Sequence, residues 1–342
     1  MNYLAKEILS FKTVGELFTN DKDIMKSEYI KLSKIWHPDC NDNSKESNDV
    51  MSIINQLYEK GLRLIEENKW EGKNYIKILC KNKKSYQIKY RTVNSFELGT
   101  MYISDTIVAY LIDNKHKNFL DNYKLRVKNF KYANDKMKTE FSKYLPNILE
   151  EFETVDNQIG IIVQKTPDLL LLKDVLDYYN GNIPDKHVAW ILSSLYNIIC
   201  YVSFNGLSHN AISLNNYFIS PQYHSGALLG GWWYTVGQGD KMLGVSKEIY
   251  NILPPKTKEN KQGNITTDLE SVRFIGKQLL GEKNGCKIKY NTTIPKTLID
   301  WMLVGSSESA VEEYSKWNIV LNNTYGKRKF VDMNLSSDIL YK

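Results

Sequence analysis

The sequence predicts an α+β protein in which an amino-terminal helical hairpin precedes a β-rich segment and a longer, mostly helical segment. Three changes of pattern along the chain indicate this order. Apolar side chains recur at about every third or fourth position between residues 24 and 65, as in amphipathic helices. Short runs rich in β-branched and aromatic residues follow between residues 74 and 130. Helical spacing returns near residues 135–144 and dominates after residue 165.

In the predicted hairpin, two amphipathic helices flank a polar loop at residues 39–47. Asn20 or Asp21 can cap the first helix, and Ser47 or Asn48 can cap the second. The polar side of the first helix carries three cations that give a positive surface able to meet acidic groups on a partner: Lys26, Lys31 and Lys34.

In the β-rich segment, the runs YIKILC, YQIKY, TIVAYLI and YKLRV predict antiparallel strands separated by turns. One more strand is expected at residues 159–165. The helices expected after it lie at about 184–204, 268–281 and 295–303.

The segment EYIKLSKIWHPDCND resembles the second helix and loop of J domains, which carry a tyrosine, a basic helix face and then His-Pro-Asp. TVGELF resembles their short first helix, and MSIINQLYEKGL places Ile54, Asn55 and Tyr58 as in their third helix. Three letters alone could be an incidental loop tripeptide, but their place between two antiparallel helices favours the J domain. Pro38 restricts the turn that presents His37 and Asp39.

This resemblance implies that the domain binds a DnaK-type heat-shock chaperone and stimulates its ATP hydrolysis, with the ATPase site on the partner and no catalysis in the J domain. The chaperone-binding residues would be Lys26, Tyr29, Lys31, Lys34, His37, Pro38 and Asp39.

From about Phe96 to Met333 the chain resembles the protein-kinase fold, with a small β-rich lobe and a larger helical lobe. KLRVKNF is similar to the strand with the phosphate-contacting lysine, here Lys128, and the next segment offers Glu140 as its ion-pair partner. Residues 188–220 are similar to the helix that leads into the catalytic loop. Residues 266–282 are similar to the buried helix after the activation segment, with Asp268 in place of that helix's aspartate.

Three departures from the kinase pattern predict that the chemistry is lost. In HNAISLNN, His209 and Asn216 are kept, but Ala211 replaces the aspartate that accepts the substrate's proton. Gly230 stands where the magnesium-binding aspartate is expected, and Gly99 is the single glycine of the phosphate-loop segment. The resemblance therefore implies a pseudokinase with no cofactor, in which ATP binding is not expected to persist.

An aromatic cluster follows the Gly-Gly pair, and two interpretations of it stay open. Trp232, Trp233 and Tyr234 could form a recognition surface for a client protein, since Trp and Tyr are enriched in interface hot spots. They could equally fill the space left by nucleotide and metal.

The composition limits the cellular compartment and the classes of partner that we expect. The four cysteines are too far apart to form a CxxC pair or a zinc site of sequence neighbours, which favours a reduced, cytoplasmic environment. No uninterrupted apolar run of transmembrane length and no signal peptide are seen, so no membrane association is expected. The net charge of +6 is spread over single lysines, which argues against a nucleic-acid partner.

The sequence thus predicts a J domain at residues 1–68, a linker and lead-in β-hairpin at 69–92, and a pseudokinase domain at 93–342. Its predicted partners are a DnaK-type chaperone and an unknown protein client, and its predicted role is that of a co-chaperone. Two alternatives remain: an atypical kinase or signalling protein targeted by its J domain, and a decoy that sequesters the chaperone.

Overall fold

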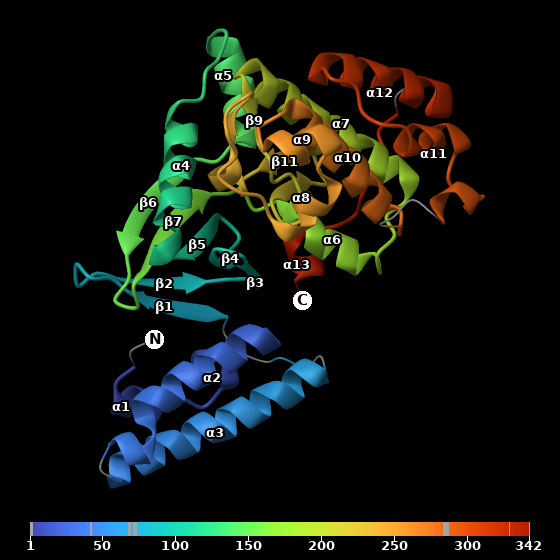
Figure 1. Cartoon of the computed structure of the whole chain (residues 1–342). Helices are drawn as coiled ribbons and strands as arrows, with labels where there is room; N and C mark the ends of the chain where they lie inside the picture. Colours follow the sequence, from blue (N-terminus) through green and yellow to red (C-terminus); the bar gives the residue numbers. More distant parts are fainter. Residues whose placement is uncertain are drawn as a thin grey trace. The chain divides into compact units, whose positions relative to one another are not determined.

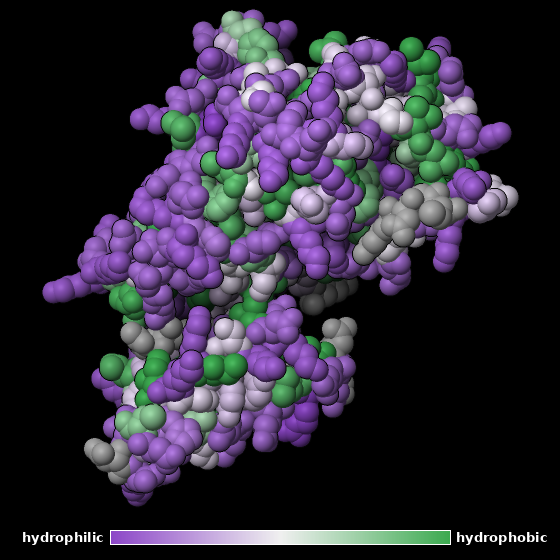
Figure 2. Space-filling view, viewed as in Figure 1, coloured by the Kyte–Doolittle hydropathy of each residue, from purple (hydrophilic) through white to green (hydrophobic). Residues whose placement is uncertain are grey.

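A computed structural model describes residues 3–41, 43–67, 70, 74–282, 287–327 and 329–341. It is a mixed α+β structure in which amino-terminal helices are followed by β-sheets, as the sequence predicts (Figure 1). The chain forms two compact units. Unit 1 comprises Met1–Lys117 and Ile148–Lys165, and unit 2 comprises Asn118–Asn147 and Thr166–Lys342. On the face seen in Figure 2 the surface is mostly hydrophilic, with hydrophobic residues in small groups.

Unit 1 begins with the helical hairpin. Its two long helices pack together through a core that includes Met25, Leu32, Val50 and Ile54. The helical segments are α1 (Ala5–Ile8), a 3₁₀ turn (Val14–Glu16), α2 (Lys22–Trp36), a second 3₁₀ turn (Pro38–Cys40) and α3 (Lys45–Glu66).

The two long helices are capped by side chains of the expected kinds. Asp21 accepts hydrogen bonds from the backbone N–H groups of Asp23 and Ile24, so the first predicted cap is confirmed. The predicted cap of the second helix is wrong, because α3 begins earlier and Ser44 accepts the hydrogen bond from the N–H of Ser47.

Two antiparallel sheets complete unit 1. Their strand orders are β1-β2 and β3-β4-β5-β7-β6. The strands are β1 (Tyr75–Leu79), β2 (Ser85–Lys89), β3 (Thr92–Phe96), β4 (Gly99–Ile103), β5 (Ile107–Asp113), β6 (Ile148–Glu153) and β7 (Gln158–Gln164). Ala109 and Leu111 pack in a core cluster with residues of β1 and β2. Since side chains alternate along a strand, Tyr110 and Ile112 point to the opposite face of the larger sheet.

Unit 2 is mostly helical and is built around α7, which packs against α10, α12 and β11. Its helices are α4 (Lys117–Lys128), α5 (Asp135–Phe141), α6 (Leu172–Tyr178), α7 (Asp185–Phe204), α8 (Lys247–Ile252), α9 (Pro255–Asn260), α10 (Ile265–Leu279), α11 (Lys296–Leu303), α12 (Ala310–Tyr325) and α13 (Ser337–Leu340). Its short strands are β8 (Leu170–Leu171), β9 (Leu207–Ser208), β10 (Tyr217–Ser220), β11 (Ser225–Leu228) and β12 (Val236–Gly237).

Within the described residues, α7 is the one helix whose length and apolar composition would allow it to cross a membrane. Of its most apolar stretch, 72% is buried inside the structure. The neighbours that surround α7 in unit 2 therefore account for its apolar character.

The predicted strand YKLRV is wrong, because these residues form the end of α4. Tyr123, Leu125 and Val127 alternate with polar residues and so imitate the period of a strand. The buried apolar residues of the helix are instead Leu120 and Tyr123, three positions apart, whereas Leu125 is 53% exposed. The helical period decides burial here.

Candidate functional site

The loop between α2 and α3 presents the side chains of His37 and Asp39 to solvent. The His37 side chain is 50% exposed and the Asp39 side chain 77% exposed. The backbone N–H of Asp39 donates to Nδ1 of His37 over 3.3 Å, which favours the proton on Nε2 in the neutral ring. The Asn41 amide donates to the carbonyls of Ile35 and His37 and holds the turn in place. The imidazole and the carboxylate can thus meet a partner without any change in the hairpin core.

Tyr29 faces α3 and helps to hold the two helices together. Its hydroxyl donates to Oδ1 of Asn55 over 3.0 Å, and its ring stacks on Tyr58 with centroids 4.2 Å apart. Asn55 and Tyr58, the two residues singled out by the resemblance to J domains, are therefore the direct partners of Tyr29. The chaperone-binding role implied for Tyr29 stays a prediction.

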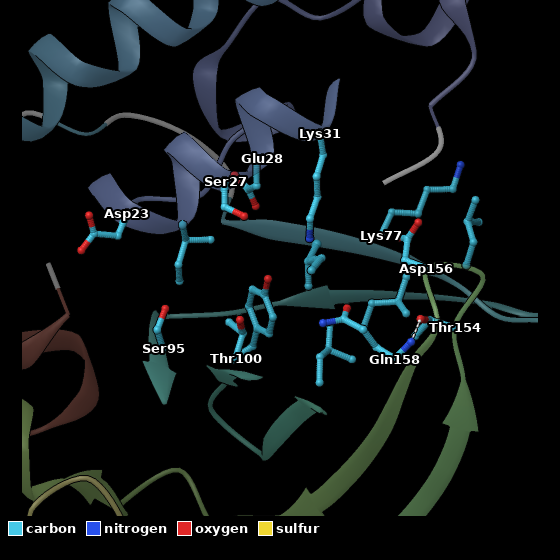
Figure 3. Close-up of a pocket in the computed structure, with 16 residues that line it drawn as sticks. Asp23, Ser27, Glu28, Lys31, Lys77, Ser95, Thr100, Thr154, Asp156 and Gln158 are labelled. Carbon is cyan, nitrogen blue, oxygen red and sulfur yellow. Dashed lines mark hydrogen bonds between the residues drawn. The ribbon is translucent and has the colours of Figure 1, made fainter. Parts of the chain in front are cut away.

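The three predicted lysines of α2 differ in their surroundings. All three are exposed residues, but Lys31 lines a cavity of about 200 Å³ formed by α2, β1 and strands of the larger sheet. Figure 3 shows its side chain extending from α2 toward the strands. Lys26 and Lys34 are not among the residues that line the cavity. Lys31 therefore differs from Lys26 and Lys34 in lining this cavity, and the single positive surface formed by the three lysines stays a prediction.

Glu28 is a buried acid on the same side of α2 that sequence reasoning missed. It is 5% exposed, and its carboxylate accepts the backbone N–H of Thr19 over 2.9 Å and the hydroxyl of Thr19 over 2.6 Å. Burial raises the pKa of Glu28 to about 7, against the opposing effects of the Thr19 hydrogen bonds and of the Lys31 charge. The sequence offered one signal of this burial: Glu28 follows the apolar Ile24 by four residues and so lies on the same side of the helix.

In unit 2, Asp268 holds the loop that contains His209. Asp268 lies in the first turn of α10, fully buried, and accepts the backbone N–H groups of His209 over 2.7 Å and of Asn210 over 2.8 Å. Burial raises the pKa of Asp268 to about 7, although these hydrogen bonds oppose the rise. Both carboxylate oxygens are therefore engaged by the loop.

His209 is a buried, neutral side chain. Burial lowers its pKa to about 3, and the backbone of Gly230 opposes this shift only in part. Neither ring nitrogen makes a hydrogen bond of normal geometry with the described residues. The ring meets Trp232 edge to face, with centroids 4.7 Å apart. Its surroundings are those of a core residue and not of a general base that titrates near neutral pH.

The structure brings together four of the residues predicted for the degenerate kinase site. The Asn216 amide donates to the Ala211 carbonyl over 2.8 Å, and the N–H of Gly230 donates to the Asn216 carbonyl over 3.3 Å. Gly231 has a φ of +83°, and a Cβ on it would lie 2.6 Å from Cε1 of His209 and 2.9 Å from Cβ of Ala211. Only glycine fits between these side chains, so the two loops are in direct contact.

Lys128 and Glu140 do not form the predicted ion pair. Lys128 ends α4, Glu140 lies in α5, and both side chains are exposed. Among the ion pairs of the described residues, none joins the two. Because Lys128 is on a helix and not on a strand, its assignment as the phosphate-contacting lysine is wrong.

The aromatic cluster that follows Gly231 lies in the core of unit 2. Trp232, Trp233 and Tyr234 are at most 5% exposed. Trp233 stacks on Tyr123 with centroids 5.6 Å apart, and the Nε1–H of Trp232 donates to the Leu228 carbonyl over 2.8 Å. The interpretation as a client-recognition surface is wrong, because such a surface needs exposed side chains. The space-filling interpretation agrees with this burial.

Gly99 belongs to a regular hairpin. It pairs with Phe96 across the β3–β4 turn, and a Cβ on it would lie 1.9 Å from the carbonyl oxygen of Leu111. This glycine therefore permits close strand packing. Within the part of the chain that the structure describes, no group of three or more His, Cys, Asp or Glu side chains is placed to hold a metal ion.

Comparisons with models of known protein families and with curated proteins give no match for this sequence.

Proposed function

We propose that this protein is a co-chaperone whose amino-terminal hairpin binds a DnaK-type chaperone and stimulates its ATP hydrolysis. One observation carries the proposal: His37, Pro38 and Asp39 form the exposed turn between two antiparallel helices, as the resemblance to J domains implies. A hydrogen bond from the Asp39 backbone orients the imidazole. The helix that leads into the turn carries exposed cations, which suits an acidic partner surface.

For the rest of the chain we propose a kinase-like unit that binds a partner and transfers no phosphate. The hydrogen bonds from the His209 loop to Asp268 support the likeness, since the resemblance places Asp268 in a buried helix that follows this loop. In protein kinases the phosphate-contacting lysine lies on the third strand of the small lobe. The third strand of the five-stranded sheet here, β5, reads IVAYLID and contains no lysine.

The same observations disfavour an atypical kinase. Ala211 has no lone pair to orient a nucleophile, and Gly230 has no ligand for Mg²⁺. The nearby acid, Asp268, has both oxygens engaged by backbone amides. A decoy that occupies the chaperone without delivering a client would bind through the same turn, so the two proposals differ in whether a substrate protein is helped to refold.

The test is single-turnover ATP hydrolysis by a DnaK-type chaperone with the full-length protein and with His37→Gln. We expect the wild type to stimulate hydrolysis and the variant to reduce it to the unstimulated rate. The variant's free energy of unfolding should stay within about 0.5 kcal/mol of wild type, because half of the imidazole is solvated. Lys45→Gln, an exposed change in the first turn of α3, is the matched control. Equal stimulation by wild type and His37→Gln would refute the proposal, and chaperone binding that does not help any substrate protein to refold would favour the decoy.

A further inference from the structure

The cavity of about 200 Å³ in unit 1 is lined on its sheet side by a pair of hydroxyl groups beside apolar side chains. Ser95 of β3 and Thr100 of β4 stand directly opposite each other in the antiparallel ladder, so their side chains share one face of the sheet. Leu111 of β5 pairs with Thr100 and continues the same row. Leu111 and Tyr102 belong to the buried apolar cluster of unit 1. This wall therefore offers both polar and apolar contacts.

Helix α2 supplies the wall across from these strands (Figure 3). Asp23, Ser27 and Lys31 stand at positions i, i+4 and i+8, and all three line the cavity. Among the ion pairs and hydrogen bonds of the described residues, none engages these three side chains or the hydroxyls of Ser95 and Thr100. These polar groups are therefore available to a molecule in the cavity.

The charged groups of the lining leave Lys31 as the cation that can hold an anion. Lys77, the other lining cation, is held in an ion pair with α1. The carboxylate of Glu28 is engaged by the buried hydrogen bonds to Thr19. Asp23 lies eight residues before Lys31, about 12 Å along the helix axis. The remaining acid, Asp156, lies in the turn between β6 and β7 and has a partner of its own.

We propose that this cavity binds a small anion that carries hydroxyl groups, such as a sugar phosphate or a sugar acid. The phosphate or carboxylate pairs with Nζ of Lys31. The hydroxyls exchange hydrogen bonds with Ser27, Ser95 and Thr100, and the C–H groups of the sugar lie on Leu111. Liquid water occupies about 30 Å³ per molecule, so the cavity has room for several waters or for one such ligand.

This site goes beyond the proposed function. The residues of the exposed turn, His37 to Asp39, are not among those that line the cavity. Binding of a small anion is measured on the protein alone, so its success or failure does not depend on any chaperone.

The test titrates the full-length protein with glucose 6-phosphate and with glucuronate at low salt, by isothermal titration calorimetry. Glucose and inorganic phosphate are titrated in parallel, because each carries one half of the recognised chemistry. At least one of the two sugar anions should bind with a Kd of about 1 mM or tighter. It should bind about tenfold tighter than glucose or inorganic phosphate. The sugar anion that binds shows whether the cavity takes a phosphate or a carboxylate.

Variants connect this binding to the cavity. Lys31→Met keeps the apolar stem and should weaken binding about tenfold, whereas Lys31→Arg keeps the charge and should stay within about threefold. The double variant Ser95→Ala/Thr100→Val should weaken it about fivefold. Lys60→Met, a change of an exposed lysine on α3 that does not line the cavity, is the matched control. Amide NMR shifts caused by the ligand should fall on α2, β3 and β4.

Three outcomes would overturn the proposal. Inorganic phosphate that binds as tightly as glucose 6-phosphate would show attraction to charge alone. Equal losses in Lys31→Met and Lys60→Met would place the anion elsewhere on the surface. The third outcome is no saturable binding of either sugar anion up to about 10 mM. Melting temperatures establish that each variant is folded, and the Ser95→Ala/Thr100→Val variant decides the question if Lys31→Met unfolds.

Discussion

Replacing Glu28 by glutamine should reverse the order of stability between wild type and variant as the pH rises. The folded-state pKa of Glu28, about 7, lies above its ordinary value of 4.5. A carboxylic acid whose pKa is raised in the folded state contributes stability that is fully present below pH 4.5. This stability is lost as the pH rises through about 7. The shift from 4.5 to about 7 corresponds to roughly 3 kcal/mol of lost free energy of unfolding.

Glutamine keeps the shape of the side chain and cannot ionise. Its carbonyl oxygen can accept the N–H of Thr19, and its amide can donate to the Thr19 hydroxyl, at a cost of about 1 kcal/mol for the altered hydrogen bonds. The variant should therefore be about 1 kcal/mol less stable than wild type at pH 4, where nearly all of the stability from the raised pKa of Glu28 is present. It should be about 2 kcal/mol more stable at pH 8, where wild type carries a buried charge.

The measurement is urea-induced unfolding of both proteins at pH 4 and pH 8, followed by far-UV circular dichroism. Hydrogen exchange of the α2 amides reports the same change locally, which is needed because a chain of two units need not unfold in one step. Asp268 titrates in the same direction but is present in both proteins, so its effect cancels. Glu59→Gln, an exposed change on α3, is the control. A difference between wild type and Glu28→Gln that is the same at both pH values would refute the reasoning.

Two further predictions concern unit 2. Trp233→Ala should lower the free energy of unfolding by about 3–5 kcal/mol and Trp233→Phe by less than half of that, because the indole is buried against Tyr123. Chemical denaturation measures both differences, and an alanine variant as stable as wild type would contradict this reasoning. The purified protein should transfer no radiolabel from ATP to itself or to generic acceptors with Mg²⁺ or Mn²⁺, because Ala211 and Gly230 supply no carboxylate; label transfer that disappears in Asn216→Ala would contradict this.

The sequence predicted best where local pattern and local structure coincide. The periods of α2, α3 and α7, the run of β-branched and aromatic residues in β5 and the Asp21 cap are all properties of neighbouring residues. The turn at His37 was predictable for the same reason, because two helices and a proline define it. The prediction of a strand around Lys128 is wrong because this short segment fits the apolar period of a strand as well as that of a helix. Only the burial of Tyr123 among its neighbours in the fold favours the helix.

Burial by distant segments could not be predicted in the same way. Nothing local distinguishes Lys31, which lines a cavity, from Lys34, which does not. The aromatic cluster around Trp233 has the composition of an interface, yet Tyr123, more than 100 positions earlier, covers it. Glu28 stands among charged and apolar residues on one helix, and the strands that bury it begin about 50 residues later. In each case a contact remote in sequence decides what the side chain can do.

The two loop histidines show how such contacts separate function from structure. His37 and His209 both stand in loops, and a sequence motif alone would make either a candidate for chemistry. His37 is half exposed and has a backbone partner that fixes its orientation, so it can meet another protein. His209 is fully buried, its pKa is lowered to about 3, and its loop is held by Asp268, so it stays neutral and contributes packing. Because recognition needs a solvated group held in a fixed position, the described structure favours His37 over His209 as the functional histidine.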